Sequence, residues 1–362
     1  PFYDYFFYDV VFPACFESRS CVSDPRRRST TGDPFRVQEC AGDSRLPMLD
    51  RRVLVALTAL LLIVVALDLG LDYRLPKLAI LGLYLALYFA CLRLLPAPRP
   101  PDHDEVSKWP TSGPIGRYGQ TGLVLVFGAT GLFALLNPFQ LVQIVLQAVG
   151  NLYLLARGRG DQPSTEVVYS LPFEDEWFVY NGGTTPATSH SWQLVTQRYA
   201  YDFVQVDDGL GRHTGRGVAL DEYLCYGADI LAAASGEVVE VVDGIRDAPW
   251  VGYGVADVFA RSFVGNHVIV RHADSEYGLY AHLIRGSIPV AGGDRIERGA
   301  LVARCGHSSH SSKPHLHFHV QDRASFYFAR GLSIRFGSIE VNGEPREEAC
   351  LTRGDRVRNR GG

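Results

Sequence analysis

The sequence lacks several features that would point to well-known classes of protein. Its formal net charge is only −4 over 362 residues, so there is no electrostatic basis for binding nucleic acid. It has no Cys-x-x-Cys pair, so none of its seven cysteines is expected to bind zinc. It also has no His-Glu-x-x-His motif, which excludes the mechanism in which the glutamate of that motif is the base.

Methionine is almost absent. The only one, Met48, precedes Leu49-Asp50-Arg51-Arg52 and a long apolar run, an order typical of a basic flank before a first membrane helix. We therefore interpret Met48 as the native start and residues 1–47 as a translated upstream extension. The alternative is a native, disordered amino-terminal segment.

Charged residues are missing from three further stretches. Val53 to Leu67, which can extend to Leu71 if Asp68 lies at the interface, and Leu78 to Leu92 are each near the lower limit of the roughly 17–25 residues that a membrane span requires. Thr121 to Ala156 has no charged residue, and as one helix it would be about 54 Å long, against about 30 Å for a bilayer core. Asn137-Pro138 divides it into two halves. Residues 48–157 thus predict three or four transmembrane helices.

The second half of this stretch decides the number of spans. It carries four amides, mostly at helical spacing, so it would be either a fourth span inside a bundle or a helix lying in the membrane interface. The amides are Gln140, Gln143, Gln147 and Asn151. Basic residues place the amino end and the second loop inside. Three spans then put the carboxyl-terminal domain outside the membrane, which is our prediction, and four put it inside.

Residues 158–164 are predicted to be a linker, and residues 165–362 a domain of short β-rich runs separated by Gly, Asp and Asn. His267 to His272 and Tyr277 to Leu283 are predicted to form a hairpin. No long helical period occurs in this part. The predicted fold is therefore multi-domain, with an α-helical membrane region and an all-β domain, an antiparallel sheet or barrel-like structure, that ends near Asn359.

Three of the chain's 11 histidines lie within five residues, in the stretch from Lys313 to Val320. Alternate side chains of a strand point to the same face. A strand here would present His315, His317 and His319 on one face and pack the apolar residues between them on the other. Imidazole is a common zinc ligand, so this row could place a metal ligand beside a catalytic histidine.

The order of four motifs resembles that of the lysostaphin/LytM-type zinc metallopeptidases. The motifs are Asp229 to Val239, Tyr280-Ala281-His282-Leu283, Gly292 to Gly306, and Pro314-His315-Leu316-His317-Phe318. The resemblance covers roughly residues 189–322. It implies a zinc cofactor and a lysostaphin/LytM-type metallopeptidase domain at residues 165–362.

The same resemblance implies roles for individual residues. In that family a histidine, an aspartate and the second histidine of the His-x-His motif hold zinc. The first histidine of that motif and the histidine of the Tyr-Ala-His-Leu strand serve catalysis. Carried over to this chain, Asp202 and His317 would be ligands, and His282 and His315 would be catalytic residues.

The first ligand histidine departs from the family pattern. The family usually has it four residues before the aspartate, where this chain has Arg198. The nearest upstream histidine is His190, twelve residues before Asp202. We predict that a longer loop returns His190 to the metal. The remaining candidates are His213, His307 and His310.

Two other features leave alternatives open. His319 stands where the family usually has an acidic residue, and it would either orient a ligand or be a partly exposed polar residue. Cys225 and Cys305 could form a disulfide if the domain is outside the membrane, and would be buried thiols if it is inside.

The resemblance implies a membrane-anchored zinc metalloendopeptidase that hydrolyses peptide bonds, in cell-wall peptidoglycan, with zinc-activated water. The expected partners are a cell-wall or other extracytoplasmic peptide substrate and membrane lipid. The alternative is a non-catalytic LytM-like binding or activator module, which the missing four-residue spacing favours. A membrane sensor with a ligand-binding β domain is a third reading.

Overall fold

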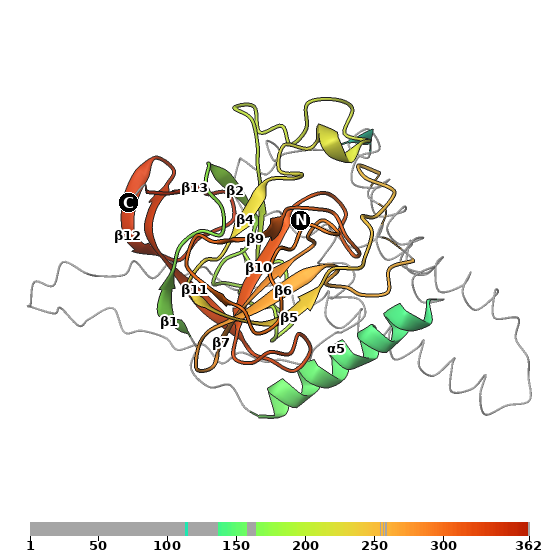
Figure 1. The fold of residues 1–362 in the computed structure, drawn as a ribbon, viewed down its shortest axis with the longest axis vertical. Helices are drawn as coiled ribbons and strands as arrows, with labels where there is room; N and C mark the ends of the chain where they lie inside the picture. The colour runs from blue at the N-terminus through green and yellow to red at the C-terminus, as the bar shows by residue number, and fades with distance from the viewer. Residues whose placement is uncertain are drawn as a thin grey trace, which may run out of the picture. The chain divides into compact units, whose positions relative to one another are not determined.

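The computed structural model describes residues 113–114, 137–157, 164–253, 255, 257 and 259–360. The predicted extension, the predicted spans before Asn137 and the predicted linker apart from Ser164 lie outside the described residues, so those expectations stay predictions. Figure 1 shows the described part as a coloured ribbon.

The described residues contain one α-helix, α5 (Pro138–Ala156), and a 3₁₀ turn, η3 (Leu220–Glu222). All other regular structure in this part of the chain is β. The strands are β1 (Ser164–Tyr169), β2 (Trp177–Asn181), β3 (Tyr201–Val204), β4 (Asp229–Leu231), β5 (Gly236–Val242), β6 (His267–Ala273), β7 (Glu276–Ala281), β8 (Arg295–Ile296), β9 (Leu301–Arg304), β10 (Leu316–Gln321), β11 (Gly331–Val341), β12 (Glu344–Ala349) and β13 (Arg356–Asn359).

Eleven of these strands form one sheet, in the order β1-β11-β13-β2-β3-β10-β7-β6-β5-β8, with β12 paired to β11 (Figure 1). The pairs are antiparallel except for β1, which runs parallel to β11. Strand β10 also pairs with β11 through Val320 and Leu332. The strands β11, β13, β2, β3 and β10 therefore close into a five-stranded ring, which confirms the predicted barrel-like all-β domain. The strands β4 and β9 form a separate two-stranded sheet.

The predicted strands agree closely with the observed ones. β6 and β7 form the predicted hairpin. The last strand, β13, ends at Asn359. Ser164, the last residue of the predicted linker, is the first residue of β1. The long β11 was not predicted.

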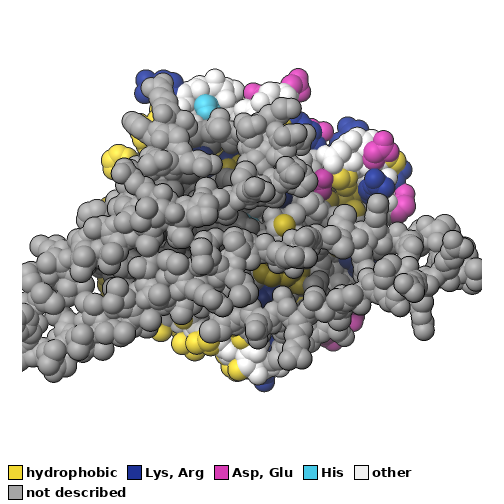
Figure 2. Space-filling view, turned by 180° about the vertical axis from the view of Figure 1, so that it is seen from behind, with side chains coloured by type: hydrophobic (Ala, Val, Ile, Leu, Met, Phe, Trp, Pro, Cys, Tyr) yellow, Lys and Arg dark blue, Asp and Glu magenta, His cyan; other side chains and the backbone are white. Residues whose placement is uncertain are grey.

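The hydrophobic core lies inside the ring and beneath β7. Alternation along β10 sends Leu316, Phe318 and Val320 into it, as the sequence predicts, and all three are fully buried. Large aromatic side chains from neighbouring strands fill the rest, and their rings pack in stacked, edge-on and tilted arrangements. They are Trp177, Tyr201, Phe203, Tyr280 and Phe336. Acidic and basic side chains are interspersed on the described outer surface in Figure 2.

Helix α5 begins at the cap residue Asn137, whose side chain accepts from Phe139 N, and has Pro138 at its first position. It is the one helix among the described residues that is long and apolar enough to cross a membrane, and 39% of its most apolar window is buried. The residues that it buries against the β domain are largely polar. They are Gln140, Gln143, Ile144, Gln147, Gly150, Asn151 and Leu154.

Candidate metal centre

The centre is built on the pairing of β3 with β10. In that antiparallel pair His317 stands directly opposite Asp202. Opposite residues of neighbouring strands have Cβ atoms about 5 Å apart, so the register alone brings imidazole and carboxylate together. His317 Nδ1 lies 3.0 Å from Asp202 Oδ1, and both residues are 6% exposed.

The other side of β10 brings in a second histidine. His317 is also the register partner of Ala281 on β7, and His282 is the next residue of the chain. His282 has a left-handed backbone, with φ of 62°. A non-glycine residue in this region is strained, and such strain is often found at functional sites. The backbone turn at His282 ends the strand and directs the imidazole toward His315, whose ring centroid lies 4.8 Å away.

His190 reaches the centre through a loop that is tied back to the chain before β3. The serines on either side of it act as the ties: Ser189 Oγ donates to Arg198 O and Ser191 Oγ donates to Gln197 O. His190 Nε2 lies 3.5 Å from Asp202 Oδ2, and the side chain is 7% exposed. The longer loop predicted from the sequence is present, although the two serines that shape it were not singled out.

Arg198 occupies the position where the resemblance expected a histidine, and its side chain turns away from the centre. Its guanidinium lies 5.0 Å from the centre of the Trp192 ring, and its Nε donates to Trp192 O. The arginine thus packs beside the base of the loop that carries His190.

The Asp202 carboxylate is the electrostatic focus of the site. Burial alone would raise its pKa, but the imidazoles of His190, His315 and His317 outweigh burial and hold the pKa well below its usual range. Asn181 Nδ2 donates to Asp202 Oδ2 at 2.8 Å. This amide contact was not predicted, because nothing in the strand sequence marks Asn181 as part of a site.

His282 and His315 are held in the same way by backbone carbonyl groups. His282 Nδ1 lies 2.9 Å from Ser308 O, and His315 Nδ1 lies 2.7 Å from Lys313 O. A carbonyl accepts only, so Nδ1 carries the proton in both rings and Nε2 is left for chemistry. Burial, reinforced for His282 by its neighbouring imidazoles, lowers the pKa of both histidines, although Asp202 works against it.

His319 belongs to the site more closely than its sequence position suggested. It is 1% exposed, which excludes the alternative of a partly exposed residue. Its Nε2 lies 2.9 Å from Gln321 Oε1, and its Nδ1 lies 3.0 Å from His317 Nε2. Because Gln321 Oε1 accepts, His319 donates from Nε2 and accepts at Nδ1. His317 therefore donates from Nε2 to His319, and its Nδ1 faces Asp202.

The other candidate histidines lie outside the cluster. His213 Nε2 accepts from Gly113 N, His307 Nδ1 bonds to Ser311 Oγ, and His310 packs its ring against Phe263. Cys225 and Cys305 are buried free thiols, the second of the two arrangements that the sequence allowed.

The donor set fits a zinc ion. The ligand atoms of His190, Asp202 and His317 lie within 4.8 Å of one another. Two imidazoles and one carboxylate form a ligand set typical of catalytic zinc. The buried Asp202 carboxylate has imidazole nitrogens of three histidines within 3.0–3.6 Å of its oxygens, those of His190, His315 and His317. This concentration of ligand atoms around one buried carboxylate supports a metal.

Comparison with known proteins gives the family. Residues 213–327 match the model of Peptidase family M23. The carboxyl-terminal domain therefore belongs to peptidase family M23. The matched range contains His282, His315 and His317, and it begins after His190 and Asp202. This finding confirms the lysostaphin/LytM-type resemblance that the motifs predicted.

Individual relatives of the M23 domain are distant. Endolysin 2638A of Staphylococcus phage 2638A is 28% identical over 149 residues, which are 38% of this chain and 27% of the endolysin. The match thus spans about a quarter of the endolysin.

Among solved structures, the catalytic domain of lysostaphin from Staphylococcus simulans is 18% identical, with 44% of this chain and 88% of that chain covered and a TM-score of 0.26. A zinc-containing peptidase from Vibrio cholerae is 18% identical, with 44% and 35% covered and a TM-score of 0.23.

Proposed function

We propose that the chain is a membrane-anchored zinc metalloendopeptidase that hydrolyses peptide bonds, with cell-wall peptidoglycan as its substrate. The observation that carries the proposal is the buried His190–Asp202–His317 cluster with two further histidines beside it. In this assignment the three clustered residues hold zinc, and His282 and His315 act on the substrate.

A zinc ion held there would supply Lewis acidity, which lowers the pKa of a bound water to near 7 and polarises the peptide carbonyl. The protein's own groups handle the protons. His282 and His315 have lowered pKa values and are neutral at rest, so each has an Nε2 lone pair that can accept the proton of the attacking water. Once protonated, the same Nε2 can donate to the developing oxyanion or to the leaving amine.

The two histidines differ in exposure. His315 is partly exposed, whereas His282 is buried. His315 is therefore the better placed of the two to reach a bulky leaving amine from the solvent side. His282, held by its strained backbone and by Ser308, would stabilise the oxyanion.

The substrate assignment follows the family and one curated relative. An endolysin matches this domain, and a membrane anchor suits work at the cell wall if the domain faces outward. In a source without peptidoglycan, the same site would act on another extracytoplasmic peptide.

Zinc content tests the ligand assignment. We expect one zinc per chain in detergent-solubilised full-length protein, and loss of that zinc in His190→Ala. His213→Ala is the matched control, because it removes a histidine that lies outside the cluster, and it should keep zinc. Zinc retained in His190→Ala would refute His190 as a ligand.

A second variant separates the enzyme from the non-catalytic module. His282→Ala should keep zinc and lose the release of new amino groups from purified peptidoglycan. If a folded wild-type chain binds no zinc, or if His282→Ala leaves function in the cell unchanged, the binding or activator module is the better assignment.

A further inference from the structure

The polarity of helix α5 is inverted relative to a surface helix of a soluble protein. Every residue of α5 that is exposed is apolar or aromatic. The large ones are Phe139, Leu141, Val142, Val145, Val149, Leu152 and Tyr153, which are 40–66% exposed. The four amides of the helix point the other way and are 0–7% exposed. A helix that contacts water would place these two sets the other way round.

Each of the four amides makes at least one hydrogen bond to the β domain. Gln140 Nε2 donates to the carbonyls of Asp257 and Ala260. Gln143 Nε2 donates to Arg261 O, and its Oε1 accepts from Phe263 N and Tyr327 Oη.

The carboxyl-terminal half of the helix is held in the same way. Gln147 Nε2 donates to Thr196 Oγ1. Asn151 donates to Gln193 O and accepts from Val195 N. Gly150 packs so tightly that a methyl group added there would overlap the Tyr327 carbonyl group. The contacts run along the whole helix.

This docking excludes a transmembrane position for α5. A span would either pull the attached β domain into the hydrocarbon or strip four amides of their partners in a medium that offers none. A helix that lies in the membrane interface avoids both costs. Its apolar side lies in the outer part of the bilayer, while its amide side stays bonded to the β domain.

Cations stand at both ends of the apolar face. Arg261 lies 5.3 Å from the centre of the Phe139 ring, and Arg157 lies 4.9 Å from the centre of the Tyr153 ring. Arginine beside an interfacial aromatic ring is well placed for lipid phosphate. The helix itself has no charged residue.

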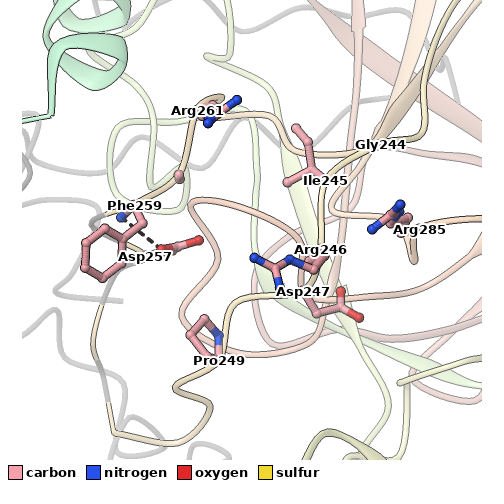
Figure 3. Close-up of a pocket in the computed structure, with 10 residues that line it drawn as sticks. Gly244, Ile245, Arg246, Asp247, Pro249, Asp257, Phe259, Arg261 and Arg285 are labelled. Atoms are coloured by element: carbon pink, nitrogen blue, oxygen red, sulfur yellow. Dashed lines mark hydrogen bonds between the residues drawn. The ribbon is translucent and has the colours of Figure 1, made fainter.

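A basic pocket adjoins the amino end of α5. Its volume is about 590 Å³, and Figure 3 shows Arg246, Arg261 and Arg285 among its lining residues, together with Asp247 and Asp257. The pocket shares Arg261 with the end of the apolar face. Asp247 is already bonded to Tyr226 Oη and His307 N. Three arginines thus stand against two aspartates in the lining of the pocket.

The chain before α5 also places it at a membrane surface. The charge-free residues 121–136, which predict a span, run directly into Asn137. The chain would thus leave the bilayer where α5 begins. We propose that the outward face of α5, from Phe139 to Tyr153, lies in the lipid interface of an anionic bilayer, with Arg157 and Arg261 at the phosphates. It would hold the M23 domain against the membrane.

Photo-crosslinking of the full chain in nanodiscs of phosphatidylethanolamine and phosphatidylglycerol tests this proposal. The probe is a phospholipid with a diazirine near its ester groups, and mass spectrometry locates the adducts. We expect adducts on outward residues such as Val142, Val145 and Leu152, and none on Gln140 or Gln147. A matched pair of variants, Val145→Glu in α5 and Val239→Glu on β5, should reduce the α5 adducts only in the first.

Three outcomes would overturn the proposal. Adducts on the amide face would mean that α5 spans the bilayer. Adducts in the predicted spans but none in α5 would mean that protein, either another apolar segment of this chain or a second copy, covers the helix. No adducts anywhere would mean that the chain does not contact lipid. The readout is independent of peptidase activity, so it can fail while the proposed hydrolysis stands.

Discussion

Gly150→Ala offers a sharp test of how α5 is attached to the β domain. An added Cβ would overlap the Tyr327 carbonyl oxygen and lie 2.9 Å from its carbonyl carbon, a spacing that requires backbone to move. A shift of about 1 Å would lengthen the neighbouring hydrogen bonds of Gln147 and Asn151 beyond the useful range. The helix would therefore lose part of its docking without any change in the metal centre.

The magnitude follows from the bonds next to Gly150. Gln147 and Asn151 make three hydrogen bonds to the domain, each worth about 0.5–1.5 kcal/mol. Alanine is more favourable than glycine within a helix by about 1 kcal/mol, which offsets part of this loss. The net loss of docking free energy is about 0.5–3.5 kcal/mol, which corresponds to roughly 2-fold to 400-fold in the opening equilibrium.

Hydrogen exchange of the full chain in detergent measures this opening. The amides of Val195 and Phe263, which donate to Asn151 and Gln143, should exchange faster by that factor in Gly150→Ala. Gly292→Ala is the matched control, because a Cβ there meets no atom within 4 Å. Unchanged exchange at both amides would refute the docking of α5 described above.

Three further predictions concern the β domain. His319→Ala should weaken zinc binding about 10–100-fold in a chelator competition, because His317 loses its acceptor, and His319→Glu should restore binding. Equal affinity in wild type and His319→Ala would contradict this. Asn266→Ala should lower the free energy of unfolding by about 1.5–4.5 kcal/mol in a urea titration, since it removes three hydrogen bonds, each worth about 0.5–1.5 kcal/mol, to the backbone of Ile245 and Leu283; a loss below about 1 kcal/mol would count against it. The pKa of His272 is lowered to about 4, chiefly by burial. The unfolded chain, with the ordinary pKa of 6.5, then binds more protons, so stability falls from about pH 6.5 to pH 4, by up to about 3 kcal/mol. His272→Gln should flatten that part of the pH profile, and an unchanged slope would disprove the assignment.

The sequence allowed much of the β domain to be predicted. Alternation in β10 separated the histidine face from the core, and the turn residues between β6 and β7 marked a hairpin. Both are local patterns, which is why they could be read without the fold. The closure of β11 on β10 and β13 was not predicted, because pairing between distant strands leaves no periodic signal in either one.

The site was predicted in part for the same reason. His317 and His282 lie in short motifs, whereas the position of His190 depends on two serine hydroxyls that bond to residues six and nine positions later. Short polar side chains of this kind occur in most loops. The amides of α5 are evident in the sequence, but only the structure shows that all four are buried against the β domain.

The closed ring has a consequence for the order of events in synthesis. The ligand strands β3 and β10 are held in place by β2, β13 and β11, and two of these are the last parts of the domain to be made. Contacts between strands so distant along the chain form slowly, since a large loop must close first. We expect the complete domain to emerge before the ligands are aligned. Zinc would then bind late in folding, and the zinc content of the protein would measure the fraction of chains in which the barrel is complete.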